Sequence, residues 1–222
     1  MPLFITFEGP EGSGKSTQAR LLARRLLREG YDSLLTREPG GTPIGRQIRQ
    51  VILSPGHRGM SPETELGLYF SDRAQHLREV IWPALDSGKI VVCDRYTDST
   101  VAYQGYGRGL PLGLIRSFDR IMTGGFRPDV TFLLDIGADA GLGRARKRNR
   151  DNQALRKEGR FETEALQFHQ RVRRGYLRMA RREPDRFLVV DAEGNPKRVH
   201  EALWASVKKA RVLPRRKRSK NV

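Results

Sequence analysis

Short apolar runs alternate along this chain with longer amphipathic stretches. The runs are rich in Val, Ile, Leu and Phe and span residues 3–7, 33–36, 90–93, 131–136 and 187–190. Continuous runs of this kind are typical of parallel strands that are buried on both faces. Because strands that alternate with helices form a parallel sheet with helices packed on it, we expect an α/β fold, a three-layer sandwich in which helices cover both faces of a five-stranded parallel sheet.

The stretches between these runs carry the signals of α-helices. We predict helices over residues 15–29, 43–53, 63–82, 111–122, 162–182 and 196–210. In the first stretch leucines occupy one side and arginines largely the other, and Gly30 follows as a stop signal. The third stretch follows Ser61-Pro62, a pair that favours an N-cap and a first helical position.

A glycine-rich motif joins the first apolar run to the first predicted helix. Residues 9–16, Gly-Pro-Glu-Gly-Ser-Gly-Lys-Ser, match the pattern G-x-x-x-x-G-K-[ST] in full. The glycines let backbone N–H groups turn inward around phosphate oxygens, and the helix N-terminus adds its positive dipole end. Lys15 can neutralise the β- and γ-phosphates of a nucleotide, and the hydroxyl of Ser16 can bind Mg²⁺. We therefore predict a P-loop that binds a nucleoside triphosphate through Gly9, Pro10, Glu11, Gly12, Ser13, Gly14, Lys15, Ser16 and Thr17.

The ends of two predicted strands narrow the class of nucleotide-binding protein. A GTPase would carry an N-K-x-D guanine motif, which does not occur in the sequence. Strands that end in Asp, as here at Asp94 and Asp135, also occur in motor ATPases, but Asp94 is followed by Arg95. At the carboxyl end of a central strand, such a carboxylate can orient an attacking oxygen or Mg²⁺-bound water, and such a guanidinium can hold a phosphoryl group through two hydrogen bonds. For this dipeptide alone, a strand-capping Asp paired with its neighbouring Arg is the alternative.

Four sequence blocks together resemble the thymidylate kinase family in order and spacing. They are the P-loop; residues 36–42, Thr-Arg-Glu-Pro-Gly-Gly-Thr; residues 70–76, Phe-Ser-Asp-Arg-Ala-Gln-His; and residues 94–105, Asp-Arg-Tyr-Thr-Asp-Ser-Thr-Val-Ala-Tyr-Gln-Gly. The similarity runs from about residue 3 to residue 210. The resemblance implies a P-loop kinase that uses ATP and Mg²⁺ to phosphorylate dTMP to dTDP, a reversible step of dTTP biosynthesis. A kinase for another pyrimidine deoxynucleotide, or for a deoxynucleoside, is the alternative within the enzymes.

The resemblance also implies which residues bind the acceptor nucleotide. They are Glu38, Pro39, Tyr69, Phe70, Arg73, Arg95, Ser99, Thr100, Tyr103 and Gln104. The loop at Glu38 and Pro39 would close over the acceptor, with Glu38 near Mg²⁺ or its waters and a cis peptide before Pro39. Gln104 and Thr100 would recognise the base, and Tyr103 would lie beneath the deoxyribose. From the residues alone, the Pro and glycines of the first of these blocks indicate only a turn.

An aromatic side chain and an arginine share a face of the third predicted helix. Tyr69 and Arg73 are spaced i, i+4, so the ring can stack on a base while the guanidinium binds a phosphate or a base edge. A core aromatic residue with a surface arginine would give the same spacing. The family usually has Phe at the position of Tyr69, and Phe70 lies beside it, so either ring is a candidate for the stack.

A basic segment follows the fourth predicted strand. Residues 144–160 hold eight cations against Asp151 and Glu158. A solvated helix face or a nucleic-acid contact would have this composition. In a phosphoryl-transfer enzyme it would instead be a mobile lid, here approximately residues 144–161, whose arginines close over the phosphates.

Catalysis would depend on positioning and charge neutralisation, because the acceptor phosphate is itself a competent nucleophile. Family members of the bacterial type have an acidic or neutral P-loop apart from its lysine, and they supply an arginine from the lid. With Glu11 and Gly12, the loop of this chain offers no arginine and fits that type. The predicted catalytic residues are Glu11, Lys15, Asp94, Arg95, Arg146, Arg148 and Arg150. The predicted metal ligands are Ser16, Glu38 and Asp94.

The positive charge of the chain is unevenly placed. Of 222 residues, 42 are Lys or Arg and 25 are Asp or Glu, a formal charge of +17. Residues 1–140 hold 17 basic and 16 acidic side chains, so the excess lies in residues 141–222. We interpret residues 1–212 as one domain and residues 213–222 as a basic, disordered tail. The excess raises a nucleic-acid-binding P-loop protein as a further class, but the absence of an aromatic-rich RNA motif and of a helix-turn-helix pattern disfavours it.

The composition argues against several other classes. The chain is 37% hydrophobic and 30% charged, as globular proteins are. It has no apolar stretch of about 18 residues and no secretory signal pattern, so we expect neither a membrane span nor export. A single cysteine, Cys93, cannot form an internal disulfide, which favours the cytoplasm. The family resemblance implies a homodimer.

Overall fold

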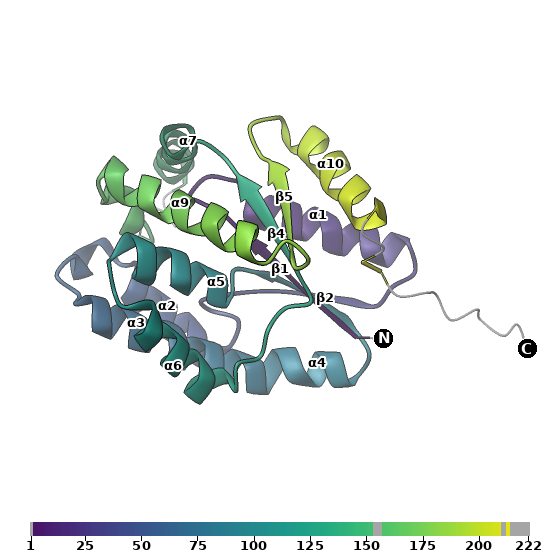
Figure 1. The fold of residues 1–222 in the computed structure, drawn as a ribbon, viewed down its shortest axis with the longest axis horizontal. Coiled ribbons are helices and arrows are strands. Elements are labelled where there is room, and N and C mark those ends of the chain that lie inside the picture. Colours follow the sequence, from purple (N-terminus) through teal and green to yellow (C-terminus); the bar gives the residue numbers. More distant parts are fainter. Residues whose placement is uncertain (1, 153–156, 210–211, 214–222) are drawn as a thin grey trace, which may run out of the picture.

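A computed structural model describes residues 2–152, 157–209 and 212–213 of the chain (Figure 1). The predicted domain, residues 1–212, lies within these ranges apart from residues 1, 153–156 and 210–211. The predicted tail, residues 213–222, falls outside them except for Leu213.

Five parallel strands form one sheet, as the sequence predicts. They are β1 (Leu3–Glu8), β2 (Ser33–Arg37), β3 (Ile90–Asp94), β4 (Val130–Asp135) and β5 (Phe187–Asp191), arranged in the order β2-β3-β1-β4-β5. Each strand agrees with its predicted bounds to within one residue. From β1 the chain crosses to β2, at one edge of the sheet, and from β3 it crosses in the opposite direction to β4. A crevice therefore opens between the carboxyl ends of β1 and β3, where open α/β sheets bind their ligands.

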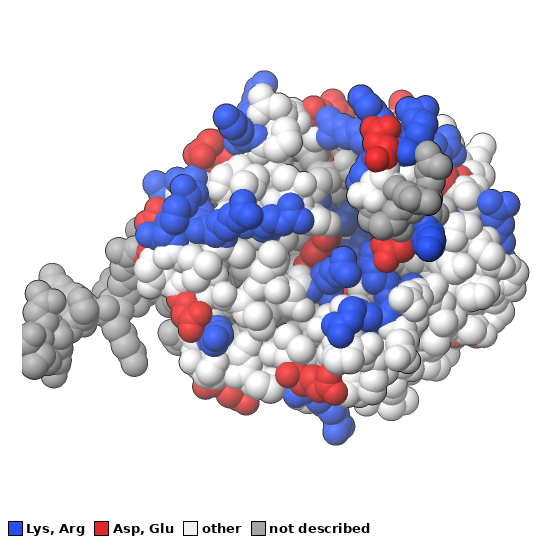
Figure 2. Space-filling view, turned by 180° about the vertical axis from the view of Figure 1, so that it is seen from behind, with Lys and Arg blue, Asp and Glu red and all other residues white. Residues whose placement is uncertain are grey.

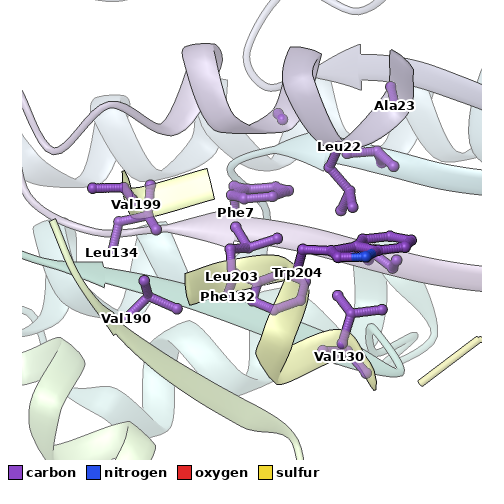
Figure 3. Packing of buried hydrophobic residues seen from close by; sticks show 14 of the residues in the cluster. Phe7, Leu22, Ala23, Val130, Phe132, Leu134, Val190, Val199, Leu203 and Trp204 are labelled. Carbon is purple, nitrogen blue, oxygen red and sulfur yellow. The ribbon is translucent and has the colours of Figure 1, made fainter. Parts of the chain in front are cut away.

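Two helices from opposite ends of the chain cover one face of the sheet. These are α1 (Lys15–Arg28) and α10 (Pro196–Lys209), which pack on each other and lie on the same side of the molecule in Figure 1. Between helices and sheet, Phe7, Leu22 and Leu203 are fully buried in one hydrophobic cluster (Figure 3). This packing holds the start of α1, and with it the P-loop, against the end of β1.

The other face of the sheet carries a thicker layer of helices. Here α9 (Leu166–Arg182) lies on β4 and β5, and α4 (Trp82–Asp86) lies on β3. Farther out, α3 (Pro62–His76) packs between α2 (Pro43–Leu53) and α6 (Leu112–Thr123), on the side opposite α1 and α10 in Figure 1. The chain thus forms the predicted three-layer sandwich.

The helix predicted over residues 63–82 is divided. It consists of α3, a π-helical turn η2 (Leu77–Ile81) and α4. Pro83, the second residue of α4, has no N–H to donate and its ring crowds the preceding turn, so a regular α-helix cannot continue through it. The helix predicted to begin at residue 162 begins instead at Leu166, after a short 3₁₀ turn, η4 (Phe161–Thr163). A further 3₁₀ turn, η1 (Pro55–His57), follows α2.

Besides η1, three helical segments are absent from the sequence prediction. They are α5 (Thr97–Thr100), the π-helical η3 (Val101–Gly107) and α7 (Ala138–Asp151). All four residues of α5 are polar and buried, and α7 buries mainly small residues with Asn149. Neither segment has the apolar spacing from which an amphipathic helix is recognised.

No helix within the described residues is long and apolar enough to cross a membrane.

The cluster under α10 gives a test of the packing. Replacing the fully buried Leu203 by Ala should lower the free energy of unfolding by about 2–5 kcal/mol, because the change removes buried methyl groups and leaves a cavity. Leu27→Ala on α1, where the side chain is 55% exposed, is the matched control and should change it by less than about 1 kcal/mol. Urea unfolding of both variants measures the difference, and equal losses would contradict the packing described here.

Candidate functional site

A cavity of about 400 Å³ opens at the carboxyl ends of β1 and β3. It is lined by Glu11, Gly12, Gly14, Lys15, Ser16, Thr17, Arg20, Arg37, Glu38, Pro39, Arg49, Leu53, Tyr69, Asp94, Arg95, Ser99, Thr100, Tyr103, Gln104, Arg148, Asn149, Glu158, Phe161 and Glu162. From behind, Figure 2 shows Lys and Arg side chains gathered around a hollow, with acidic side chains among them. The cavity brings the P-loop, the Asp94-Arg95 pair and the predicted base-binding residues to one place.

The P-loop is packed so closely that two of its glycines have no room for a side chain. A Cβ on Gly9 would lie 2.4 Å from the carbonyl oxygen of Leu134, and one on Gly12 would lie 2.0 Å from that of Gly141. Both glycines also have positive φ angles, 144° and 69°. The glycine spacing of the motif therefore follows from the contact of the loop with β4 and α7.

Lys15 is buried at the start of α1 beneath this loop. Its ammonium donates to the carbonyl oxygens of Gly9 and Pro10 at 2.9 and 2.7 Å, and to the Ser13 hydroxyl at 3.2 Å. Burial and the nearby charge of Arg95 lower the pKa of Lys15 to about 8. The site thus keeps a cation at the loop whose charge is sensitive to pH just above neutrality.

Ser16 and Asp94 are adjacent across the crevice. The Ser16 hydroxyl donates to Oδ2 of Asp94, while Oδ1 of Asp94 is buried and has no partner among the described residues. Mg²⁺ prefers oxygen ligands and usually takes only one or two from a protein beside those of phosphates and water. These two side chains fit that ion, although the described residues contain no cluster of three His, Cys, Asp or Glu side chains.

Glu38, predicted as a metal ligand, lines the cavity, but its carboxylate is paired within the protein. Its carboxylate lies in the interior, where Oε2 accepts from Nε of Arg73 at 2.7 Å and Oε1 contacts Nδ1 of His76 at 3.0 Å. Both oxygens are therefore engaged by α3. The peptide between Glu38 and Pro39 is cis, as the resemblance implies. Gly40 N–H donates to Oδ1 of Asp72 at 2.9 Å. Helix α3 therefore holds the loop of residues 38–41, the acceptor loop, at two points.

Arg95 stands at the centre of the cavity wall. Its Nη2 donates to Oε1 of Glu11 at 2.8 Å and to the Tyr103 hydroxyl at 3.2 Å, and its Nη1 donates to the Ser99 hydroxyl at 3.1 Å. Although burial would raise the pKa of Glu11, the charges of Arg95 and Lys15 outweigh it and lower that pKa to about 2. Arg95 has a φ of 76°, an unusual conformation for a residue with a side chain.

Glu8, the last residue of β1, supports this arrangement from below. It accepts from Tyr96 N–H at 2.7 Å and from the hydroxyls of Ser99 and Tyr176 at 2.6 and 2.8 Å. Burial and the charge of Asp98 raise the pKa of Glu8 to about 7. Sequence reasoning missed Glu8 and Tyr176. A carboxylate at the end of an otherwise apolar strand was the available signal for Glu8.

Of the two aromatic residues predicted to stack on the base, only Tyr69 lines the cavity. Phe70 is fully buried in another cluster, where its ring lies 5.9 Å from that of Phe118. Arg73 does not line the cavity and instead donates to Glu38 and, at 3.1 Å, to the Thr100 hydroxyl. Of the i, i+4 pair, Tyr69 therefore faces the cavity, whereas Arg73 lies in the layer behind it.

Among the three predicted lid arginines, Arg148 alone lines the cavity. Its Nη2 lies 3.2 Å from Oε1 of Glu162, which gives it a carboxylate partner at the edge of the site. Arg146 donates through Nε to the backbone oxygen of Glu162 at 3.2 Å, and Arg150 is not among the lining residues. Gly9, Pro10 and Ser13 of the P-loop are likewise not among the lining residues of this cavity.

A charged bridge across the cavity was not foreseen from the sequence. Arg49 on α2 donates through Nε and Nη2 to both oxygens of Glu158 at 2.9 and 2.7 Å, and through Nη1 to the backbone oxygen of Pro39 at 3.0 Å. It thereby links the acceptor loop to the segment after α7. The sequence shows Arg49 only as one polar position of an amphipathic helix.

A second cavity lies on the other side of the P-loop. It is lined by Gly12, Ser13, Gly14, Thr17, Gln18, Arg144, Ala192, Glu193, Gly194, Asn195, Pro196 and Val199. Arg144 on α7 donates to the backbone oxygens of Ala192 and Glu193, both at 2.8 Å. The two cavities share Gly12, Gly14 and Thr17, so a ligand on the P-loop can extend from one into the other.

Comparisons of the sequence agree on one family. The family described as thymidylate kinase matches residues 7–203. The thymidylate kinase of Syntrophotalea carbinolica is 52% identical over 96% of this chain and 99% of its own length. That of Desulfovibrio desulfuricans is 51% identical over 89% of this chain and 91% of its own length.

A solved structure shows the same architecture. The crystal structure of thymidylate kinase from Ehrlichia chaffeensis superposes with a TM-score of 0.75 at 32% sequence identity, and covers 93% of this chain and 98% of its own. The fold predicted from the apolar runs is therefore confirmed.

The lowered pKa of Lys15 makes a prediction about nucleotide binding. A bound triphosphate is anionic and should raise this pKa, so the complex holds a proton that the free protein loses above about pH 8. Affinity for the triphosphate should fall as the pH rises through 8, by up to about tenfold per unit. Calorimetric titrations between about pH 7 and pH 9 measure this slope. The Lys15→Arg variant, whose guanidinium stays charged, should lack it, and a flat profile in the unaltered protein would contradict the assignment.

Proposed function

The chain belongs to the thymidylate kinase family and phosphorylates dTMP with ATP, and we propose that the transfer takes place in the cavity at the ends of β1 and β3. One observation carries this proposal: the P-loop and the Asp94-Arg95 pair open into the same cavity as Tyr69, Thr100 and Gln104. A donor phosphate and an acceptor nucleotide can therefore meet there. An oxygen of the acceptor phosphate would attack the γ-phosphorus as the bond to the bridging oxygen of ADP breaks.

In this proposal the cations of the cavity neutralise the phosphates. Lys15 at the start of α1, Arg95 directly after β3 and Arg148 on α7 all line this cavity. From these three elements they would surround the transferred group. Because the acceptor phosphate needs no strong base, charge neutralisation and alignment account for the catalysis. Glu11 orients Arg95 through their 2.8 Å contact.

Ser16 and Asp94 are the residues proposed to hold Mg²⁺. Bound there, Mg²⁺ would supply positive charge that offsets the charge of the phosphates. Oδ1 of Asp94, which is buried and has no partner among the described residues, supports this assignment. Glu38, whose oxygens are engaged by α3, would instead fix the acceptor loop.

The acceptor nucleoside would lie against the deeper part of the cavity. Tyr69 offers its ring for stacking, and Gln104 and Thr100 offer hydrogen bonds to the base edge. Tyr103 would lie beneath the deoxyribose, with its hydroxyl held by Glu11 at 2.9 Å. The neighbouring Ser99 is tied to Arg95 and supports it from behind.

The second cavity is the proposed site of the adenine ring of ATP. It adjoins the P-loop, and Arg144 presents a guanidinium at its wall. A planar cation can stack on a purine. The segment between residues 144 and 161, of which 153–156 lie outside the described residues, contributes Arg144 to this cavity and Arg148 to the other. This placement supports the proposed role of the segment as a cover over the polyphosphate.

A homodimer is proposed through the outer layer of helices. Exposed apolar side chains lie on α2 and α6, at Ile44, Val51, Leu114 and Ile121. Both helices pack against α3, so these residues belong to one layer.

The buried, unpaired Cys93 supports a place in the reducing cytoplasm.

The role of Arg148 can be tested against a neighbouring cation. Arg148→Ala should lower kcat by about a hundredfold or more, because it removes one preorganised donor from a developing charge. Lys147, exposed and outside both cavities, is the control, and its replacement by Ala should change kcat by less than about threefold. A dTMP-dependent assay of ADP formation measures both variants.

Lys15→Ala should lower kcat by several orders of magnitude in the same assay, and near-normal turnover would refute the site.

The dimer proposal has its own test. Ile121→Asp should shift the protein toward the monomer in sedimentation experiments, because a charge placed in an apolar interface loses its hydration without a partner. Leu27→Asp, at an exposed apolar position on α1, should leave the mass unchanged. A monomeric unaltered protein, or an unchanged mass of the Ile121 variant, would overturn the proposed interface.

A further inference from the structure

Glu65, on the first turn of α3, is fully buried, and its carboxylate is paired with amide and guanidinium groups of the described residues. Its Oε1 accepts from Nε2 of Gln104 at 2.7 Å. Arg108 approaches both oxygens, with Nε at 3.3 Å from Oε1 and Nη2 at 3.2 Å from Oε2. Arg160 donates through Nη2 to Oε2 at 2.6 Å. Glu65 lies outside the cavity lining, behind Gln104.

This contact fixes which way the amide of Gln104 faces. An ionised carboxylate offers only acceptors, so the group of Gln104 that meets Glu65 must be the NH₂ and cannot be the carbonyl. A flipped amide would place its oxygen against the carboxylate, with the loss of a buried hydrogen bond and added repulsion. The carbonyl oxygen of Gln104 is therefore the end left for the cavity, beside at most one N–H of the amide.

The fixed orientation matters because pyrimidine bases differ at this edge. Thymine and uracil present an N–H donor at N3 next to a carbonyl acceptor. Cytosine presents an unprotonated N3 acceptor next to an amino donor. A glutamine that can rotate its amide pairs with either pattern, whereas one whose NH₂ is held behind pairs with the first pattern only.

We propose that Glu65 is a positioning residue that sets the base specificity of the site, by holding Gln104 with its carbonyl oxygen toward a pyrimidine N3–H and so excluding cytosine. This proposal rests on the proposed function, in which Gln104 contacts the base. Arg108 and Arg160 support this role, since their guanidinium groups pair with the buried carboxylate of Glu65.

The other polar side chain at the base, Thr100, cannot supply this selectivity. Its hydroxyl oxygen accepts from Nη1 of Arg73 at 3.1 Å. A hydroxyl still has a rotatable hydrogen and a second lone pair, so it can donate to a carbonyl or accept from an amino group. Discrimination between the two base patterns therefore falls to the amide that Glu65 holds.

The test compares kcat/KM for dTMP, dUMP and dCMP in the full-length protein. The unaltered protein should use dUMP better than dCMP by about a hundredfold or more, because both lack the 5-methyl group and only dUMP has the N3–H. In Glu65→Gln, the neighbouring amide can donate as well as accept, so Gln104 can rotate. The ratio of kcat/KM for dTMP to that for dCMP should then fall by at least about tenfold, mainly through KM for dCMP. Glu63→Gln, an exposed position on the same helix, should keep the ratio.

The outcomes separate a specific role from a structural one. Equal losses for all three nucleotides, or an unchanged ratio in a folded Glu65→Gln protein, would overturn the proposal. If thermal unfolding shows that this variant does not fold, Glu65→Asp replaces it in the test. Asp keeps the charge but withdraws it from Gln104, so the ratio should again fall. An unchanged ratio in Glu65→Asp would also overturn the proposal. Use of dCMP as readily as dUMP by the unaltered protein would also overturn it.

A further variant separates this proposal from the one on which it rests. Gln104→Ala should lower kcat/KM for dTMP and abolish most of the preference over dCMP. If it changes neither, Gln104 does not contact the base and the proposed acceptor site is itself wrong. If Gln104→Ala has this effect while Glu65→Gln leaves the ratio unchanged, the acceptor site stands and only the positioning role of Glu65 fails.

Discussion

The placement of Arg95 between the buried carboxylate of Glu8 and the partly buried carboxylate of Glu11 is the constraint on which the site depends. Its guanidinium pairs directly with Glu11 of the P-loop and reaches Glu8 of β1 through the Ser99 hydroxyl. Glu8 in turn accepts from Tyr96 N–H and so holds the turn in which Arg95 has a positive φ angle. Because charge-assisted hydrogen bonds are short and directional, the P-loop, the end of β1 and the end of β3 are fixed relative to one another.

A second constraint comes from a single helix, α3. Its residues Glu65, Tyr69, Asp72 and His76 follow the spacing of one helical face, but all four side chains carry polar groups. Tyr69 faces the cavity, Asp72 and His76 hold the acceptor loop, and Glu65 holds Gln104. In the proposed function, one rigid helix would thus set both the position of the loop over the nucleotide and the polarity of the base-binding surface, so the two could not shift independently.

The sequence predicted what depends on local signals and missed what depends on contacts between distant segments. The five strands follow from continuous apolar runs, and the P-loop follows from a short contiguous motif of glycines with Lys15, so both can be recognised within a single stretch of sequence. In contrast, α5 and α7 bury polar or small residues and have no apolar period. The engagement of Glu38 by Arg73 joins residues 35 positions apart, and that of Glu65 by Arg160 joins residues 95 apart. Charged residues of this kind are read as surface positions until the fold shows their partners.

The pairing of charges also explains how a cavity rich in arginines can be stable without a ligand and still attract one. Arg95 pairs with Glu11, Arg148 with Glu162 and Arg49 with Glu158. These carboxylates offset the mutual repulsion of the cations and hold each guanidinium in position. A phosphate carries more charge than a carboxylate, so it can share or take over these donors without a large rearrangement of the arginines. The acidic residues that line the cavity are therefore part of its affinity for polyphosphate, because they hold the cations in place before the phosphate arrives.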